Sequence, residues 1–318
     1  MLAVILAAGG GTRLKPLTAQ RSKAMLPVAG RPMVERVMEG LQAAGAERFI
    51  LVAGPNDAEI EPYFRSAGWR ERVAIVRQLR PLGMANALLQ AAALIDGDFV
   101  LSACDNLLPE AEAAALLHTW RERPGLNGLL ALLRLPPEKL ASSSAVALDG
   151  EWVRRIVEKP APGQAPSDIA SLPLYIFSPA LLEFLPLVQP SPRGEYELQD
   201  ALQRLIDGPG RVAGWLASSR RTLTRPADLL ALNLHYLEQM GAAALQIGSP
   251  APGARLHPPL LIETGVEIGP GCTLGPGVYL ERGCRVEAGA ELRRCVVLRG
   301  GVVGEGEKRE GEVITNES

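Results

Sequence analysis

The sequence predicts an α/β protein in which a mostly parallel sheet is followed by a short β-helix, and two periodicities support this prediction. Up to about residue 240, short β-rich runs alternate with helical patterns, which is typical of α/β layers. From Ile262 onward, apolar residues recur every six positions, which is the repeat of a β-helix. Between the two, the Pro- and Gly-rich stretch Gly248–Pro259 ends regular structure. We therefore expect domains at 1–245 and 260–318, joined by a linker at 246–259.

The α/β part is expected to alternate strands and helices. Pro32 begins the first helix and Gly45 lies near its C-terminal cap, with apolar residues at the helical period between them. The expected elements are strands at Leu2–Ala7, Phe49–Ala53, Val73–Val76 and Phe99–Ala103, and helices at Pro32–Gly45, Ile60–Phe64 and Met84–Ile95. Parallel sheets bind ligands beyond the carboxyl ends of their strands, so we expect Ala8–Gly11 and Cys104–Asn106 to share one cleft.

Two sets of positions define the repeat of the C-terminal part. Every sixth residue from Ile262 to Leu298 is apolar, and the residues four positions after each form a second set that ends at Val302. Glycines keep the same spacing, which places residues that adopt positive φ readily at the turns. Seven hexads make slightly more than two coils of three hexads each. A stack this short leaves its edges uncovered, so we expect a homo-oligomer.

The composition excludes several classes of protein. The chain of 318 residues is 47% hydrophobic and 21% charged, which is typical of a folded globular protein. Its formal net charge of −2 is not that of a nucleic-acid-binding protein. No apolar stretch is as long as a membrane span and no basic segment precedes the apolar N-terminal run, so we expect a cytoplasmic protein without membrane contact. The four cysteines contain no CxxC pair, so we expect reduced thiols and any metal to be held by oxygen.

A glycine turn follows the first predicted strand in the segment 6–14 (LAAGGGTRL). Such a turn lets backbone amides approach a phosphate, although it fits neither the P-loop nor the GxGxxG fingerprint, and the glycines alone also fit a tight structural turn. Two cationic residues beside the next loop favour phosphate binding over a purely structural turn. Arg13 and Lys23 flank that loop, and a guanidinium with an ammonium suits a triphosphate that loses pyrophosphate.

The segments 6–18 (LAAGGGTRLKPLT) and 22–32 (SKAMLPVAGRP) resemble the signature of the sugar-1-phosphate nucleotidyltransferases, also called nucleotide-sugar pyrophosphorylases. Similar patterns continue at Gln78, Gly83, Asp105 and 158–160, and a hexapeptide tail also occurs in this family. The resemblance implies a Rossmann-like nucleotidyltransferase domain followed by a short left-handed β-helix. It also implies a Mg²⁺-dependent reaction, in which a sugar 1-phosphate attacks the α-phosphate of a nucleoside triphosphate and pyrophosphate leaves.

The resemblance further implies the roles of single residues. Arg13, Lys23 and Asp105 are the expected catalytic residues. Asp105 is also the expected Mg²⁺ ligand, because it follows a buried strand and a carboxylate is the hard ligand that this ion prefers, although Asp105 with Asn106 also fits an Asx turn. The residues expected to bind the nucleotide are Leu6, Ala8, Gly9, Gly10, Gly11, Thr12, Gln78 and Gly83. Glu158 is expected to accept sugar hydroxyls, and Lys159 to contact the sugar phosphate.

The chain departs from the family pattern at several positions. Met84 stands where a small hydroxyl residue is usual, and a glycine that adjoins the sugar is missing near Ser143 and Ser144. Ser171 and Pro173 replace an Asn and a Gly before Tyr175, and Thr222 stands where a second metal-binding Asp is expected. Glucose with a thymidine or uridine nucleotide and mannose with a guanosine nucleotide therefore stay open, although the segment 22–27 is slightly closer to the glucose branch.

Two other functions compete with turnover. A Thr hydroxyl is a weaker Mg²⁺ ligand than a carboxylate, so Thr222 favours a catalytically weakened homologue that binds a nucleotide sugar and regulates a partner. The hexapeptide repeat also occurs in acyltransferases. That chemistry needs an imidazole base, and His257 is the only histidine near the repeat, so an assembly module fits the tail better.

Overall fold

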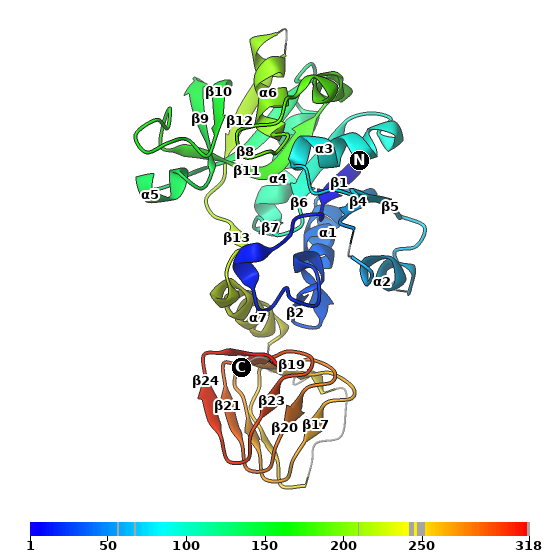
Figure 1. The fold of residues 1–318 in the computed structure, drawn as a ribbon, viewed down its shortest axis with the longest axis vertical. Helices are drawn as coiled ribbons and strands as arrows, with labels where there is room; N and C mark the ends of the chain where they lie inside the picture. Colours follow the sequence, from blue (N-terminus) through cyan, green and yellow to red (C-terminus); the bar gives the residue numbers. More distant parts are fainter. Residues whose placement is uncertain (56, 67, 209, 242–244, 247–251, 317–318) are drawn as a thin grey trace. The chain divides into compact units, whose positions relative to one another are not determined.

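The computed structural model describes residues 1–55, 57–66, 68–208, 210–241, 245–246 and 252–316. The chain forms two compact units (Figure 1). The sheet unit consists of Met1–Gly10 and Val34–Arg221, and the β-helix unit consists of Gly11–Met33 and Thr222–Ser318. The linker expected at 246–259 lies partly outside the described residues, and the compact units divide the chain at other positions. The segment Gly11–Met33 therefore belongs to the same unit as the C-terminal repeat.

A nine-stranded sheet forms the centre of the sheet unit (Figure 1). Its strands are, in spatial order, β5 (Val73–Arg77), β4 (Arg48–Ala53), β1 (Leu2–Leu6), β6 (Phe99–Ala103), β11 (Ile169–Phe177), β8 (Gly128–Arg134), β12 (Val212–Leu216), β10 (Trp152–Glu158) and β9 (Ser144–Asp149). The strands β5, β4, β1 and β6 are parallel, as predicted from the sequence for the strands in the first hundred or so residues. Beyond β6 the strands mix directions, because β11 pairs antiparallel with both β6 and β8.

Helices and short elements connect these strands. They are α1 (Met33–Ala43), α2 (Ile60–Ser66), α3 (Met84–Ala91), η3 (Ala92–Leu94), β7 (Asn106–Leu107), α4 (Glu110–Arg121), α5 (Pro137–Leu140), η4 (Pro179–Leu187) and α6 (Leu198–Asp207). The three helices predicted in the first hundred residues are all present. The predicted helix from Met84 to Ile95 ends as the 3₁₀ turn η3.

The main core of the sheet unit lies between one face of the sheet and the elements α3, η4 and α6. Leu2, Val4 and Leu6 of β1 point into this core together with Leu88 of α3. Alternate residues of a strand point to opposite faces, and Ile5 is also completely buried. A strand that is buried on both faces reads as a continuous apolar run, which is how the sequence revealed β1.

The β-helix unit joins an N-terminal segment, a long helix and a solenoid. Its elements before the solenoid are η1 (Thr12–Leu14), η2 (Lys23–Met25), β2 (Pro27–Val28), β3 (Arg31–Pro32) and α7 (Pro226–Met240), and β13 (Arg221–Thr222) lies where the chain passes from one unit to the other. Asn233 of α7 is completely buried. Its side chain accepts from the Ala29 amide at 2.7 Å and donates to the Pro27 carbonyl at 3.1 Å, so the helix holds the β2–β3 hairpin.

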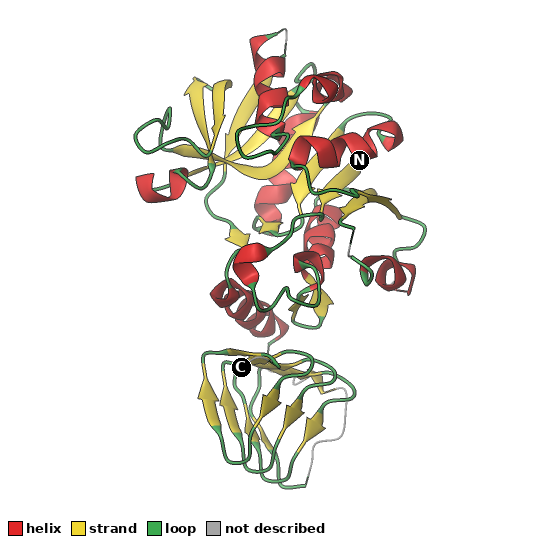
Figure 2. Cartoon of the chain, in the orientation of Figure 1, coloured by secondary structure: helices red, strands yellow, loops and turns green. Residues whose placement is uncertain are grey.

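The solenoid is a left-handed β-helix with three rows of parallel strands (Figure 2). The first row contains β14 (Leu245–Gln246), β16 (Leu260–Ile262), β19 (Val278–Leu280), β22 (Val296–Val297) and β25 (Val313–Ile314). The second contains β15 (Arg255–Leu256), β18 (Thr273–Leu274), β21 (Glu291–Arg293) and β24 (Lys308–Glu310). The third contains β17 (Glu267–Ile268), β20 (Arg285–Val286) and β23 (Val302–Val303). Rows of five, four and three strands make the solenoid longer than the two coils expected from the hexads.

The hexad pattern changes phase by one residue after β21. Ile262 pairs with Leu280, as three hexads require, but Leu280 then pairs with Val297 and not with Leu298. Arg294 lies in this turn with a φ of 50°, in the left-handed region. The coil is therefore one residue shorter than three hexads, and a strict count of six loses the repeat there.

The phase change corrects which residues face inward near the C-terminus. Val302, expected inside, has 45% of its surface exposed, whereas Val303 is completely buried. The small inward positions predicted at Cys272 and Cys284 are confirmed by their burial. Among the residues that the structure describes, no helix is both long and apolar enough to cross a bilayer.

Candidate functional site

The carboxyl ends of four parallel strands meet at one edge of the sheet unit. Leu6 at the end of β1 is in register with Val52 of β4 and with Ala103 of β6. The Cys104 amide donates to the Leu6 carbonyl at 3.1 Å, so the glycine turn and the segment after β6 leave the sheet side by side. The glycine turn and the segment Cys104–Asn106 thus begin at the same edge of the sheet unit, whereas Gly11 belongs to the other compact unit, so the cleft expected for Ala8–Gly11 and Cys104–Asn106 stays a prediction.

The glycine turn presents its backbone at this edge. Leu6 and Ala8 are buried, and the Leu6 side chain packs in the core. Gly9 and Gly10 are exposed, and a Cβ atom built on Gly9 would meet no atom within 4 Å. The space beside these amides is therefore open to a ligand, as phosphate binding requires.

Gln78 lies at the same edge, directly after β5, and is buried with 3% of its surface exposed. Its amide nitrogen donates to the Gly83 carbonyl at 3.1 Å and to Asn86 Oδ1 at 2.9 Å. Both donors of the side chain are thus used within the chain. Among the described residues, no hydrogen bond reaches Oε1, so the orientation of Gln78 is fixed and its oxygen can accept from a ligand.

Gly83 has a structural reason to be glycine. Its φ is 101°, and a Cβ atom at this position would lie 2.6 Å from the Tyr196 carbonyl oxygen. The Ala85 amide donates to the same carbonyl at 3.0 Å. The close approach that we expected between Gly83 and a nucleotide is therefore made, in the described structure, with the backbone at Tyr196. Met84 is partly buried and packs against the core, which explains its apolar side chain.

Asp105 and Asn106 follow the end of β6. Asp105 is partly exposed, and Asn106 has only 3% of its surface exposed. Neither side-chain atom of Asn106, Nδ2 or Oδ1, has a hydrogen-bond partner in the part of the chain that the structure describes. An unpartnered buried amide costs free energy, so this position is suited to a bound polar group.

The donors at the end of β6 fit Mg²⁺. No three His, Cys, Asp or Glu side chains form a cluster among the described residues. Mg²⁺ does not need one, because it is commonly held by one or two protein oxygens together with substrate phosphates and waters. The Asp105 carboxylate and the orphaned Asn106 amide are hard oxygen donors of this kind.

A second polar group forms where β9, β10 and α6 meet. Ser144 of β9 is in register with Glu158 of β10, and its hydroxyl donates to Glu158 Oε2. Gln199 of α6 donates to the Ser144 hydroxyl at 2.8 Å, and both residues are buried. Lys159 Nζ lies 3.5 Å from Glu158 Oε1. One carboxylate oxygen is thus held by the chain, and the other, beside Lys159, is available to a ligand.

Tyr175 and Arg220 extend this polar group towards Asp105. The Tyr175 hydroxyl is buried and lies 3.0 Å from the Ser171 hydroxyl. Burial raises the pKa of Tyr175, the bond to Ser171 lowers it, and the charge of Glu158 raises it further. Burial lowers the pKa of the Arg220 guanidinium, while Asp105 and Tyr175 oppose that shift. Arg220 is thus a cation within electrostatic reach of Asp105.

Two departures from the family pattern are explained by strand β11. Its pairing with β8 is irregular between Ser171 and Tyr175, and Pro173 lies in this irregular stretch. Proline has no amide to give to a ladder, so it fits a bulge. Ser171 supplies the hydroxyl beside Tyr175.

The segment Gly11–Lys23 belongs to the β-helix unit and forms a closed loop. Gly11 has a φ of 58°, and a Cβ atom there would lie 3.0 Å from Thr18 Cγ2 and 3.3 Å from Lys23 Cβ. The Thr18 hydroxyl donates to the Gly11 carbonyl at 2.9 Å. The structure therefore brings Gly11 against the base of Lys23. Thr12 and Arg13 are exposed in the 3₁₀ turn η1.

Thr222 lies before α7 in the same unit. Its hydroxyl is 3.2 Å from the Thr224 hydroxyl. Asp228 is the nearest acid along the chain, and its carboxylate caps α7 by accepting from the Thr224 and Arg225 amides at 2.8 and 2.7 Å. Asp228 is thus committed to the helix cap and does not replace the acid expected at 222.

The sequence assigns no functional role to four residues of these polar groups: Asn106, Ser144, Gln199 and Arg220. The sequence does contain a signal for the first, since Asn106 adjoins Asp105 at a strand end. For Ser144, the sequence shows only that a glycine of the family pattern is missing near this position. Gln199 joins Ser144 through contacts 55 residues apart, and no local pattern reveals such a pair.

Comparisons with known proteins agree with this geometry. A family model described as nucleotidyl transferase matches residues 2–215. The chain is 32% identical over 222 residues to a UTP–glucose-1-phosphate uridylyltransferase of Haloferax volcanii, covering 68% of this chain and 89% of that protein. It is 32% identical over 241 residues to a glucose-1-phosphate thymidylyltransferase of Streptomyces griseus, covering 75% and 66%. A solved UDP-glucose pyrophosphorylase with UDP-glucose shares the fold, with a TM-score of 0.67, 23% identity and coverage of 75% of this chain and 98% of that one.

Proposed function

Because the chain belongs to the nucleotidyl transferase family, we propose that it transfers a nucleoside monophosphate from a nucleoside triphosphate to a sugar 1-phosphate. An oxygen of the sugar phosphate forms a bond to the α-phosphorus, the bond from that phosphorus to the β-phosphate oxygen breaks, and pyrophosphate leaves. The observation that supports this most directly is the edge of the sheet unit, where the open glycine turn, Gln78 and Asp105 follow neighbouring parallel strands.

We propose glucose 1-phosphate as the sugar substrate, with UTP or dTTP as the nucleotide. The relatives from Haloferax volcanii and Streptomyces griseus carry these substrates in their names. Gln78 supports a uracil or thymine base, because its Oε1 is left to accept from the N–H of such a ring.

The phosphates would be held by backbone and by cations. Exposed amides of the glycine turn fit the triphosphate, and Arg13 and Lys23 would neutralise the charge on the α-phosphate and on the leaving pyrophosphate. The attacking phosphate oxygen is already an anion, so no general base is needed. Positioning and charge neutralisation are the contributions left to the protein.

The sugar would bind at Glu158. Its Oε1 would accept hydroxyls of the sugar while Ser144 holds Oε2, and Lys159 would contact the sugar phosphate. This assignment supports a role for Ser144 where the family has glycine, since the serine hydroxyl fixes the carboxylate that reads the sugar.

Asp105 and Asn106 would hold Mg²⁺ at the end of β6. The ion, when bound, would supply charge neutralisation to the phosphate oxygens. Arg220 adds a fixed positive charge near Asp105.

We further propose that the protein is cytoplasmic and forms a homo-oligomer. All four cysteines are free and buried, which supports a reducing compartment. Among the described residues, the last strand of each β-helix row pairs with a strand on one side only, which supports cover by another copy. A monomer in sedimentation at micromolar concentration would contradict the oligomer.

The alternative is a homologue that binds nucleotide sugar without turnover, which Thr222 favours. We expect pyrophosphate release when UTP or dTTP is incubated with glucose 1-phosphate and Mg²⁺. The assay should include ATP, CTP and GTP with glucose, mannose and N-acetylglucosamine 1-phosphates. Release by another pair would correct the substrates. No release from any pair, together with binding of a nucleotide sugar, would replace the enzymatic proposal by the regulatory one.

A further inference from the structure

We propose that Glu281, a residue of the β-helix, is a positioning residue for the loop that carries Arg13 and Lys23. It would act through an ion pair with Arg21. This inference rests on the proposed function, in which that loop binds the triphosphate. It gives the solenoid a part in the reaction besides assembly.

The ion pair joins parts of the β-helix unit that are 260 residues apart in sequence. Arg21 Nη1 lies 2.7 Å from Glu281 Oε1, and the two side chains have 9% and 11% of their surface exposed. The other carboxylate oxygen, Oε2, accepts from the Arg299 amide at 2.8 Å. Both oxygens of Glu281 are therefore held, so its direction is set by the coil. A buried pair with this geometry is rigid, because neither charge can be left alone without a large desolvation cost.

Arg21 lies two residues before Lys23, inside the closed part of the loop. The Thr18 hydroxyl ties the chain to the Gly11 carbonyl, and Lys23 Cβ lies against Gly11. A displacement of Arg21 therefore moves Lys23 together with the glycine that follows the phosphate-binding amides. The hairpin beyond Lys23 is held separately by Asn233, so the ion pair controls the half of the loop that carries the cations.

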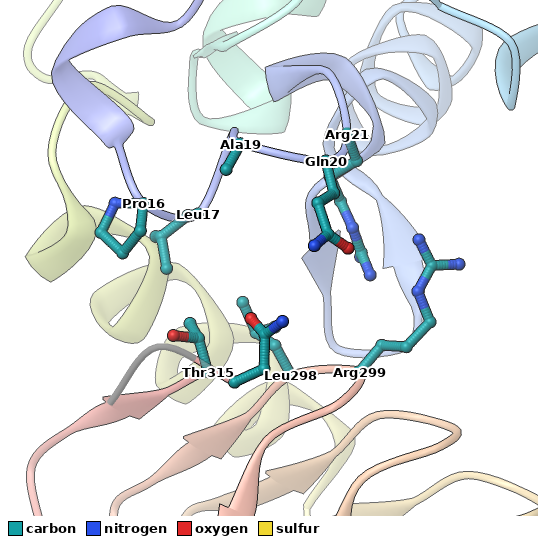
Figure 3. A pocket seen from close by; sticks show the side chains of 9 residues that line it. Pro16, Leu17, Ala19, Gln20, Arg21, Leu298, Arg299 and Thr315 are labelled. Atoms are coloured by element: carbon teal, nitrogen blue, oxygen red, sulfur yellow. The ribbon is translucent and has the colours of Figure 1, made fainter.

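The ion pair lies beside a small pocket of about 40 Å³ that is open to solvent (Figure 3). Pro16, Leu17 and Gln20 form the wall from the loop, and Leu298, Arg299 and Thr315 form the wall from the coils. Arg21 lines the same pocket. Beside this pocket, the hydrogen-bonded ion pair of Arg21 and Glu281 joins the loop to the coil.

The test compares neutral and reversed variants of the full chain. Glu281→Gln keeps an acceptor for the Arg299 amide and removes only the charge. It should lower kcat/KM for the nucleoside triphosphate by about tenfold to 100-fold, the range expected when a binding group moves by a fraction of an ångström to one ångström. The KM for sugar 1-phosphate should change little. Arg21→Gln should have the same effect, and the reversed pair Arg21→Glu with Glu281→Arg should recover part of the loss.

Glu287→Gln is the matched control, because it removes the same charge from an exposed ion pair with Arg285, one hexad further along the same coil. Its kinetics should equal those of the wild type. Thermal melts of each variant test whether it is folded at the temperature of the kinetic assay. Equal kcat/KM for the triphosphate in folded Glu281→Gln and wild type would overturn the inference, and so would an equal rise in the KM values of both substrates.

Equilibrium binding of UTP provides a measurement that does not need turnover. If the wild type neither binds nor turns over any triphosphate, the proposed function fails. If the wild type binds UTP and Glu281→Gln binds it with the same affinity, only the positioning role fails. Weaker UTP binding in Glu281→Gln and Arg21→Gln, but not in Glu287→Gln, supports it.

Discussion

The sheet unit and the β-helix unit bury polar groups in different ways. The sheet unit has polar side chains near its strand ends, including Asn106, Ser144 and Gln199, each less than 9% exposed. In the β-helix unit, Asn233 of α7 is buried, but among the described residues the core of the solenoid itself contains only Leu, Val, Ile, Ala and Cys. Burial, with a smaller contribution from Glu281, raises the pKa of the Cys284 thiol to about 12, so this cysteine stays protonated as a small apolar side chain.

This difference separates residues that serve stability from residues that serve a ligand. Buried polar groups reduce stability unless they are fully paired. The sheet unit contains such a destabilising group at one edge, where the side chain of Asn106 has no hydrogen-bond partner among the described residues. In the β-helix, the charged residues Glu263 and Glu281 lie outside the core and accept hydrogen bonds from the same unit. We therefore expect the residues that bind a ligand at the sheet edge, and we expect the solenoid to stabilise the fold and to position the loop.

The largest effect is expected for Asp105→Asn. Removing the carboxylate should lower kcat by at least about 100-fold, as expected for loss of one charged group that stabilises a transition state. The unfolding free energy should change by no more than about 0.5 kcal/mol, because Asp105 is partly exposed. Pyrophosphate release and a urea melt measure the two quantities. Asp96→Asn, which breaks an exposed pair with Arg48, is the control. Unchanged turnover in Asp105→Asn would remove the assignment.

A smaller effect is expected for Ser144→Ala. The variant leaves Glu158 Oε2 and the Gln199 amide without their shared partner. A hydrogen bond to a charged group contributes about 1.5–3 kcal/mol, so the KM for sugar 1-phosphate should rise about tenfold or more. The KM for the triphosphate should stay the same. Ser143→Ala, whose hydroxyl donates only to the Lys139 carbonyl among the described residues, should match the wild type. If both variants have the wild-type KM, the buried polar group serves packing alone.

The smallest effect is expected for Asp200→Asn on α6, an acid of the sheet unit outside the proposed site. Burial, followed by the charge of Glu197, raises the pKa of Asp200, while Arg204 and Arg193 lower it. A raised pKa means that the folded state favours the protonated acid. The stabilising contribution is thus complete below the unfolded pKa, near about 4, and is lost as the pH rises through the folded pKa.

Asp200→Asn should therefore have a slightly higher Tm than the wild type at pH 7, and this difference should shrink towards pH 4. Thermal melts across that range measure it. A difference that grows on acidification would show that the fold stabilises Asp200 as the anion and would contradict the prediction.

The parts of the fold that repeat were predictable from the sequence. Strands β1, β4, β5 and β6 follow from apolar runs, and the solenoid follows from its hexads. The turn at Arg294, where the coil is one residue shorter than three hexads, was not predictable, because no glycine or proline marks it in the sequence. Except for β10, which the run at 153–157 indicates, the strands after β6 were not predictable either, since antiparallel pairs such as Tyr175 with Leu101 depend on contacts that are distant in sequence.

The candidate site was predictable only where residues lie next to strand ends. Asp105 and Gln78 directly follow buried strands, so topology alone places them at one edge. Ser144 and Gln199 were missed because their roles come from register and from a helix packed on the sheet. Gly83 was assigned to a ligand because a glycine requirement looks the same in sequence whether a nucleotide or the Tyr196 backbone causes it.

The pairing of Arg21 with Glu281 also has a consequence for synthesis on the ribosome. The two partners are 260 residues apart, and a ribosome adds about 5–20 residues per second. About 10 to 50 s therefore pass between the synthesis of Arg21 and that of Glu281. A chain that stops before the solenoid is made lacks this anchor for its N-terminal loop. Incomplete chains would thus carry the signature residues without the support that aligns them.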